Sequence, residues 1–135
     1  MIWHYTKHVH LPAITKERLI KPAEKYIGVN ERPIVWFSTN PLWERTVHDI
    51  QQLLAMGIYP ARIGVSEETA PYPFNKLRRL SRMKARTADD LINAASRLGA
   101  DPKEWRGTLD PVPSELWQSV EVWKDKQWIS QEGWR

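Results

Sequence analysis

The sequence predicts one α+β domain spanning residues 1–135, and three observations indicate this class. Runs of β-branched and aromatic residues lie near both ends of the chain, apolar residues with helical spacing lie between them, and no change in composition marks a linker. A chain of 135 residues has the usual length of one domain. Because strands at both ends enclose the helices, the order favours α+β over a doubly wound parallel sheet.

The N-terminal segment predicts a strand, a short helix and a second extended piece. Residues 1–7 combine bulky strand formers with polar residues and predict the first strand. Pro12 suits the first turn of a helix, which should end near Arg18. Residues 19–22 then form a short extended segment closed by proline, and the polar stretch 23–32 predicts a loop.

The middle of the chain predicts a buried strand, a helix and another strand. A continuous β-branched and aromatic run at 34–39 is typical of a central strand, and Asn40-Pro41 ends it. Apolar residues recur on one stripe of 42–56, which predicts a helix that Gly57 terminates. The third strand is centred on 61–65.

The C-terminal half predicts two further helices and a β-rich end. Residues 74–83 form the first helix, and a capping box at Thr87-Ala88-Asp89-Asp90 starts the second, which Gly99 ends. A short turn follows at Asp101-Pro102. The last third predicts strands at 105–109, 119–123 and 127–130, a turn at 124–126 and a loose tail from Gln131.

Composition narrows the classes of function. The formal net charge of +4 and the pI near 9.5 suit anionic partners. The absence of cysteine excludes disulfides, zinc–thiolate sites and thiol nucleophiles. No apolar run approaches the ~20 residues of a membrane span, and the N-terminus has no signal-peptide pattern. We therefore expect a cytoplasmic protein without membrane contact, in which eight tryptophans build a core or line a site for flat rings.

The first strand ends in a polar and aromatic triplet, His4-Tyr5-Thr6. His4 and Thr6 share one face of a strand, whereas Trp3 and Tyr5 share the other. His4, His8 and His10 are close enough in sequence to suggest a metal site, but no carboxylate follows at ligand spacing. The pattern favours hydrogen-bonding or surface histidines and no metal.

Two later strands also carry polar groups among apolar ones. Ser38 and Thr39 follow Trp36 and Phe37 at the end of the predicted central strand, and Trp43 lies one turn further on. This pattern fits either a core strand with a helix cap or the rim of a cleft, where polar groups gather. Near the C-terminus Glu121 alternates with valines, so its carboxylate lies either on an exposed strand face or, if buried, against a partner.

A basic run lies in and just after the helix predicted at 74–83. Six cations lie between Lys76 and Arg86, among them Arg78, Arg79 and Arg82. They either track a phosphate backbone or form an ordinary solvated helix face. Aromatic residues do not alternate with these cations, so the base-stacking part of a single-strand site is missing.

Taken in order, His4-Tyr5-Thr6, Phe37-Ser38-Thr39 and Glu121 resemble the ADP-ribosyltransferase-like fold. The chain also resembles a group of small bacterial and phage proteins with His-Tyr-Thr, Val-Trp-Phe-Ser and Val-Glu-Val-Trp motifs. The resemblance implies a single α+β domain in which two small mixed or antiparallel sheets, with flanking helices, surround an NAD cleft.

The resemblance also implies roles for particular residues. His4 would bond the ribose of the adenosine half of NAD, and Glu121 would stabilise the oxocarbenium-like transition state as nicotinamide leaves. Side chains from His4, Ser38 and Glu121 should then converge on one cleft. The remaining residues implied to bind NAD are Tyr5, Thr6, Trp36, Phe37, Ser38 and Trp43.

The function implied in this way is an enzyme that cleaves NAD or transfers its ADP-ribose to a protein or nucleic-acid acceptor, in a toxin or phage–host conflict system. One alternative is a non-catalytic module of the same fold that contacts nucleic acid or a protein through residues 76–86 (Lys76, Arg78, Arg79 and Arg82). Another is an enzyme acting on RNA 2′-phosphates, which ranks lower because no clear Arg-His pair is present.

Overall fold

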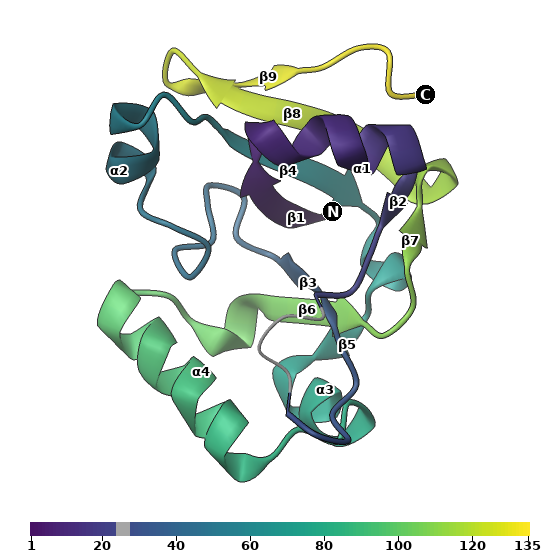
Figure 1. Cartoon of the computed structure of the whole chain (residues 1–135), viewed down its shortest axis with the longest axis vertical. Coiled ribbons are helices and arrows are strands. Elements are labelled where there is room, and N and C mark those ends of the chain that lie inside the picture. Colours follow the sequence, from purple (N-terminus) through teal and green to yellow (C-terminus); the bar gives the residue numbers. More distant parts are fainter. Residues whose placement is uncertain (24–27) are drawn as a thin grey trace.

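A seven-stranded antiparallel sheet organises the chain, and its strands come from both ends of the sequence (Figure 1). The computed structural model describes residues 1–23 and 28–135; part of the loop predicted at 23–32, residues 24–27, lies outside the described residues. The strand order is β5-β6-β3-β1-β4-β8-β9, and a two-stranded sheet pairs β2 with β7. The α+β class is thereby confirmed.

The strands are short; β3, β4 and β8 match aromatic or β-branched runs of the sequence, whereas β5 and β7 are two-residue strands that were not predicted. In the large sheet they are β1 (Ile2–Lys7), β3 (Val35–Ser38), β4 (Pro60–Val65), β5 (Tyr72–Pro73), β6 (Trp105–Thr108), β8 (Trp117–Lys124) and β9 (Gln127–Ser130). In the small sheet they are β2 (Leu19–Ile20) and β7 (Val112–Pro113).

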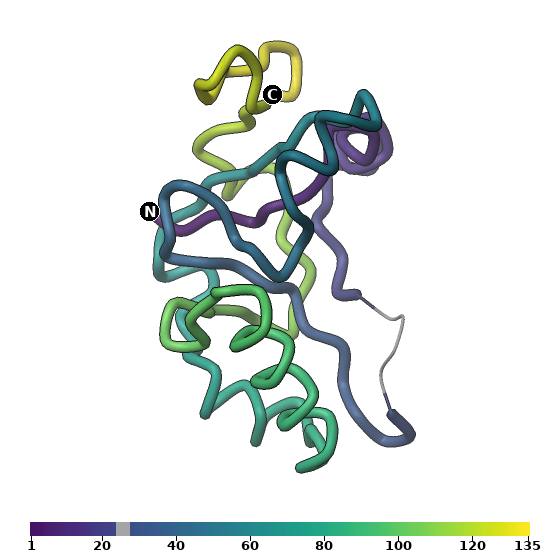
Figure 2. The backbone as a smooth tube through the Cα atoms, turned by 90° about the vertical axis from the view of Figure 1, so that its left-hand side faces the viewer, coloured from purple at the N-terminus to yellow at the C-terminus, as the bar shows by residue number. Residues whose placement is uncertain are grey.

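Helices cover both faces of the large sheet. They are α1 (Leu11–Glu17), α2 (Ile50–Ala55), α3 (Phe74–Leu80) and α4 (Ala85–Leu98), with 3-10 turns η1 (His8–His10), η2 (Glu67–Thr69), η3 (Pro102–Glu104) and η4 (Ser114–Leu116). In Figures 1 and 2, α3 and α4 occupy one end of the long axis, and β9 with the C-terminus lies at the other.

Strand register decides which side chains can meet. Across β1, β4 and β8, Tyr5 lies opposite Arg62, and Arg62 lies opposite Glu121, so these three share one face of the sheet. His4 lies opposite Ile63 in the same ladder. Side chains alternate along a strand, so His4 and Ile63 point to the other face.

Three apolar clusters form around the sheet. The largest joins Ile2, Ile63 and Val120 with Leu11 of α1 and Ile20 of β2. The second lies between α3, α4 and β6, and the third between α2 and the centre of the sheet. These smaller clusters consist of Phe74, Ala88, Ala95 and Trp105, and of Tyr5, Trp43 and Leu53.

Strand β6 lies so close to its neighbours that Gly107 has no room for a side chain. A Cβ at this position would lie 2.8 Å from the Val35 carbonyl oxygen.

Several expectations for local structure are confirmed. Helix α1 ends where Arg18 adopts a left-handed conformation, with φ of 55°, and α4 ends at Gly99, with φ of 77°. The strands predicted around 34–39 and 61–65, and the hairpin at the C-terminus, are present as β3, β4 and β8–β9.

The helix predicted over 42–56 is wrong for most of its length, because only α2 is helical. Asp49 caps α2 by accepting a hydrogen bond from the Gln52 amide at 3.0 Å. Before this cap, Trp43 is buried and its Nε1 donates to the His48 carbonyl at 2.7 Å. These contacts hold 41–49 as a folded loop in place of helical turns.

Two smaller predictions also need correction. The capping box at Thr87 is absent because α4 already begins at Ala85, and the Thr87 hydroxyl donates to Glu31 Oε1 at 2.8 Å. The tail predicted to be loose from Gln131 contains Trp134, which packs against the largest apolar cluster and contacts the Trp117 ring at a tilt of 39°, with ring centroids 6.0 Å apart.

Candidate functional site

A cavity of about 300 Å³ lies beside the place where β1 and β3 meet. These strands share one register position, Trp3 opposite Ser38. Beyond it His4 Nδ1 lies 2.8 Å from the Trp36 carbonyl oxygen, so a side chain bridges the two strands. The cavity is lined by Trp3, His4, Tyr5, Trp36, Phe37, Ser38, Glu44, Thr46, Val47, Leu91, Ala94 and Trp105.

Indole rings provide much of the cavity wall. Trp36 and Trp105 contact each other edge to face with centroids 5.8 Å apart, and Phe74 packs behind both. Trp3 lines the cavity from β1, and Leu91 closes it from α4. Large aromatic faces with few polar groups are typical of sites that bind flat rings.

Glu44 brings a buried carboxylate to this aromatic cavity. Its side chain belongs to a residue that is 8% exposed. Oε1 accepts a hydrogen bond from Trp105 Nε1 at 3.2 Å, and Oε2 accepts from the Thr46 hydroxyl at 2.5 Å and the Thr46 amide at 3.2 Å. All three contacts come from donors, as an ionised carboxylate requires.

No cation neutralises Glu44 among the described residues. The salt bridges found in ranges 1–23 and 28–135 join Lys21 to Glu17 and Arg62 to Glu121. Glu44 is held by neutral donors instead. A buried negative charge of this kind attracts a cation that enters the cavity.

His4 is held as a neutral hydrogen-bonding group. Burial lowers the pKa of its imidazole, and the hydrogen bond to the Trp36 carbonyl opposes this change. A carbonyl oxygen only accepts, so Nδ1 carries the proton and donates it. Nε2 of the neutral ring is then left as an acceptor.

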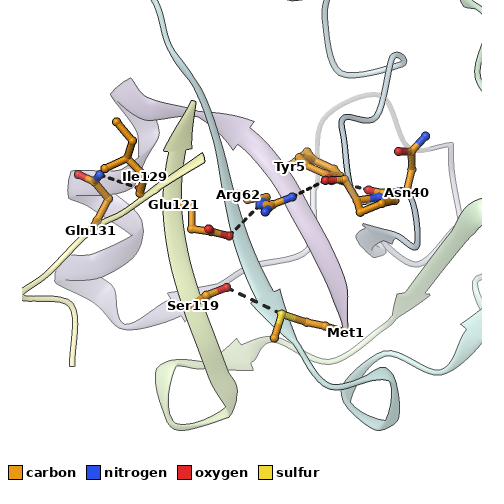
Figure 3. Close-up of polar contacts among 9 residues, drawn as sticks. Met1, Tyr5, Asn40, Arg62, Ser119, Glu121, Ile129 and Gln131 are labelled. Atoms are coloured by element: carbon orange, nitrogen blue, oxygen red, sulfur yellow. Dashed lines mark hydrogen bonds and ion pairs between the residues drawn. The ribbon is translucent and has the colours of Figure 1, made fainter. Parts of the chain in front are cut away.

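Glu121 takes part in a different cluster, centred on Arg62 (Figure 3). Arg62 Nε donates to Glu121 Oε1 at 2.8 Å, and Arg62 Nη1 donates to the Pro41 carbonyl at 2.6 Å. The guanidinium carbon lies 4.2 Å from the Trp128 ring centroid and 4.9 Å from that of Trp3. The charge of Glu121 is thus used to neutralise a buried arginine.

Tyr5 borders both the cavity and the Arg62 cluster. Its hydroxyl donates to the Asn40 carbonyl oxygen (Figure 3). Burial raises the pKa of this phenol to about 12, and the neighbouring Arg62 opposes the rise. Tyr5 is therefore a neutral hydrogen-bond donor throughout the physiological pH range.

The structure brings together some of the residues expected to form one cleft and separates others. His4, Tyr5, Trp36, Phe37 and Ser38 line the cavity. Glu121, Thr6 and Trp43 are not among its lining residues in the described part of the chain. Trp43 packs behind Tyr5 with ring centroids 5.2 Å apart, and Thr6 pairs with Ala61.

The expected convergence of His4, Ser38 and Glu121 is therefore not found. Register places His4 and Glu121 on opposite faces of the sheet, and the carboxylate that reaches the cavity is that of Glu44. Glu44 was not predicted as a site residue because 42–56 was expected to be a helix, on which a single glutamate gives no indication of a site. The adjoining Thr46, which bonds it, was the available signal.

The other predicted site residues lie elsewhere. Lys76, Arg79 and Arg82 are exposed on and after α3, whereas Arg78 is half-buried with its guanidinium 5.8 Å from the Phe74 ring. His8 accepts a hydrogen bond from the Tyr59 amide at 2.8 Å. Among residues 1–23 and 28–135, no group of three potential ligands could hold a metal ion, and no helix is long and apolar enough to cross a membrane.

Comparison of the chain with protein-family models, curated proteins and solved structures finds no match.

We expect Glu121 to stabilise the fold through Arg62. Removing the carboxylate in Glu121→Ala leaves a largely buried guanidinium, whose side chain is 10% exposed, without its anion. The free energy of unfolding should fall by about 2 kcal/mol, less than for a fully buried pair because Glu121 is partly solvated. Urea denaturation measures the change.

Glu17→Ala provides the matched control for that variant. It removes the carboxylate of the exposed Lys21–Glu17 pair, whose N–O distance is 2.7 Å. An exposed pair of this kind is worth less than about 1 kcal/mol. Equal losses in the two variants would contradict a structural role for the Arg62–Glu121 pair.

Burial of neutral His4 makes stability depend on pH. Because its folded-state pKa is lowered, the unfolded chain binds more protons, so stability falls as pH drops below about 6.5. His4→Asn keeps a donor for the Trp36 carbonyl but cannot titrate. Between about pH 7 and pH 5 the wild type should lose more unfolding free energy than this variant, by at most about 1.4 kcal/mol per pH unit. Parallel stability curves would contradict the assignment.

Proposed function

We propose that the cavity binds the nicotinamide end of NAD+ and that the protein cleaves the bond between nicotinamide and ribose. The uncompensated Glu44 carboxylate within an aromatic wall carries this proposal. Nicotinamide in NAD+ is a flat, positively charged ring. Indole faces attract such a cation, and a buried carboxylate adds to the attraction.

The size of the cavity limits what it can hold. A volume of about 300 Å³ is at the lower end of small-molecule sites, so the ring and its ribose fill it while the rest of the dinucleotide extends outside. His4 Nε2 is available to accept a hydrogen bond from a ribose hydroxyl. Ser38, which is 1% exposed and borders the cavity, supports the wall beside Trp3.

The chemistry proposed here requires a negative charge at the reacting sugar. When the ribose–nicotinamide bond breaks, its electron pair leaves with the ring nitrogen, nicotinamide becomes neutral, and the sugar carbon becomes cationic. Glu44 stabilises this carbon electrostatically until water or an acceptor attacks it and loses a proton. The ADP-ribosyltransferase-like resemblance supports the same reaction, with Glu44 taking the role that the sequence suggested for Glu121.

Charge selection provides a direct test of the cavity. The cation 1-methylnicotinamide and neutral nicotinamide share one ring, so their difference in affinity isolates the charge. Calorimetry should show the cation binding about tenfold more tightly to the wild type, and the preference should disappear in Glu44→Gln. The amide that replaces the carboxylate in this variant still offers an oxygen to Trp105 Nε1, which makes the substitution conservative.

The catalytic part of the proposal has a separate test. Release of nicotinamide from NAD+ should fall at least about 100-fold in Glu44→Gln, because the transition-state charge is lost. Glu121→Gln distinguishes the two carboxylates and should leave the release rate within about threefold of wild type. Absence of NAD+ binding, or loss of release in Glu121→Gln alone, would contradict the assignment.

A further inference from the structure

We infer that the surface around the turn between α3 and α4 binds the phosphate backbone of a nucleic acid. This inference does not depend on the cavity or on NAD+. The surface, called here the basic ridge, consists of six exposed cations: Arg32, Lys76, Arg79, Arg82, Lys84 and Arg86.

Two segments far apart in sequence contribute to the basic ridge. The Arg32 amide donates to the Ser81 carbonyl at 2.7 Å, which fixes the loop before β3 against the end of α3. Glu31 Oε1 accepts from the Lys84 amide at 3.3 Å and from Thr87. Figures 1 and 2 agree in placing this loop beside the α3–α4 turn, at one end of the molecule.

No cation of the ridge forms a salt bridge within the described chain. Desolvation opposes ionisation of Glu31, but the hydrogen bond from Thr87 and, to a smaller extent, the nearby charge of Lys84 lower the pKa of this carboxyl, so Lys84 alone is partly compensated. The two salt bridges found in ranges 1–23 and 28–135 involve other residues, and the Glu31 carboxylate is occupied by Lys84 N and Thr87. Asp89 and Asp90 are exposed on the next turn of α4 and bound the ridge on that side. Like charges gathered without partners repel each other, so an external polyanion is the natural counter-charge.

The side-chain types favour phosphate over a protein partner. Four of the six cations are arginines, whose forked guanidinium matches phosphate oxygens. A stable protein interface needs an apolar centre, whereas Val29 is the one large exposed apolar residue in the described part of the adjoining loop. The ridge therefore fits a hydrated, highly charged chain.

The same residues predict recognition without sequence specificity. Bases are read by stacking or by hydrogen bonds to their edges, whereas a cationic side chain can bind a phosphate without contacting a base. The aromatic ring beside the ridge, Tyr72, is partly buried and has Lys76 Nζ 4.9 Å from its centroid. Single strands and duplexes of unrelated sequence should consequently bind alike at equal charge density.

Fluorescence anisotropy with short labelled DNA oligonucleotides, single-stranded and duplex, tests the inference. Binding should weaken steeply as salt rises from about 50 to 200 mM. The variant Arg79→Glu/Arg86→Glu removes two phosphate contacts from helix surfaces, so the log–log salt slope should fall by about 1.4 on single strands and about 1.8 on duplexes. Affinity at low salt should fall at least about tenfold.

Lys16→Glu/Lys103→Glu is the matched control, because it changes net charge equally at exposed sites on α1 and η3. Thermal unfolding verifies that both double variants remain folded. Binding lost only in the ridge variant supports the inference. Equal loss in both variants, binding independent of salt, or binding to anionic lipid vesicles but not to oligonucleotides would overturn it.

Discussion

Arg62 is a buried positive charge in the large sheet, and four separate segments of the chain meet to compensate it. Strand β8 supplies Glu121, the segment after β3 supplies the Pro41 carbonyl, and the indoles of Trp3 and Trp128 cover the guanidinium. An unpaired buried guanidinium would cost several kcal/mol, roughly the stability of a small domain. The need to compensate the buried charge of Arg62 therefore links the register of the central strands to the pairing of β9 with β8.

The contacts that compensate Arg62 also position the loop that borders the cavity. Arg62 anchors the loop 41–49 through Pro41, and Tyr5 anchors the preceding residue through the Asn40 carbonyl. From these fixed points the loop turns so that Trp43 is buried behind Tyr5 and Glu44 borders the cavity. The Glu121 carboxylate pairs with Arg62, and the loop that Arg62 holds through Pro41 places a second carboxylate, that of Glu44, at the cavity. The two glutamates are consequently not interchangeable: one has a cationic partner and the other has neutral donors.

Much of the fold follows from local patterns, but the site does not. The β-branched runs that form β3 and β4, and the Gly99 that ends α4, act through backbone sterics within a few residues. The aromatic wall of the cavity was also predictable, because Trp36 and Ser38 are two residues apart on one strand and therefore lie on the same face. Whether His4 and Glu121 share a face depends on register across three strands, and a shift of one residue would reverse the answer. The position of the Glu44 carboxylate depends on its hydrogen bond from Trp105 and on the anchoring of its loop. Neither contact produces a periodic pattern in the sequence.

The cavity and the basic ridge have opposite charge and share one helix. Leu91 and Ala94 of α4 line the cavity, while Arg86 stands on the ridge in the first turn of the same helix. A helix of 14 residues held by buried Ala88 and Ala95 keeps the two surfaces in a fixed relation. A carboxylate disfavours phosphate in the cavity, and the ridge arginines, which form no salt bridge in the described part of the chain, disfavour cations, so the two proposed sites would differ in the charge of the group that each binds. If both proposals hold, a cationic ring in the cavity and a polyanion on the ridge would therefore not compete for the same residues.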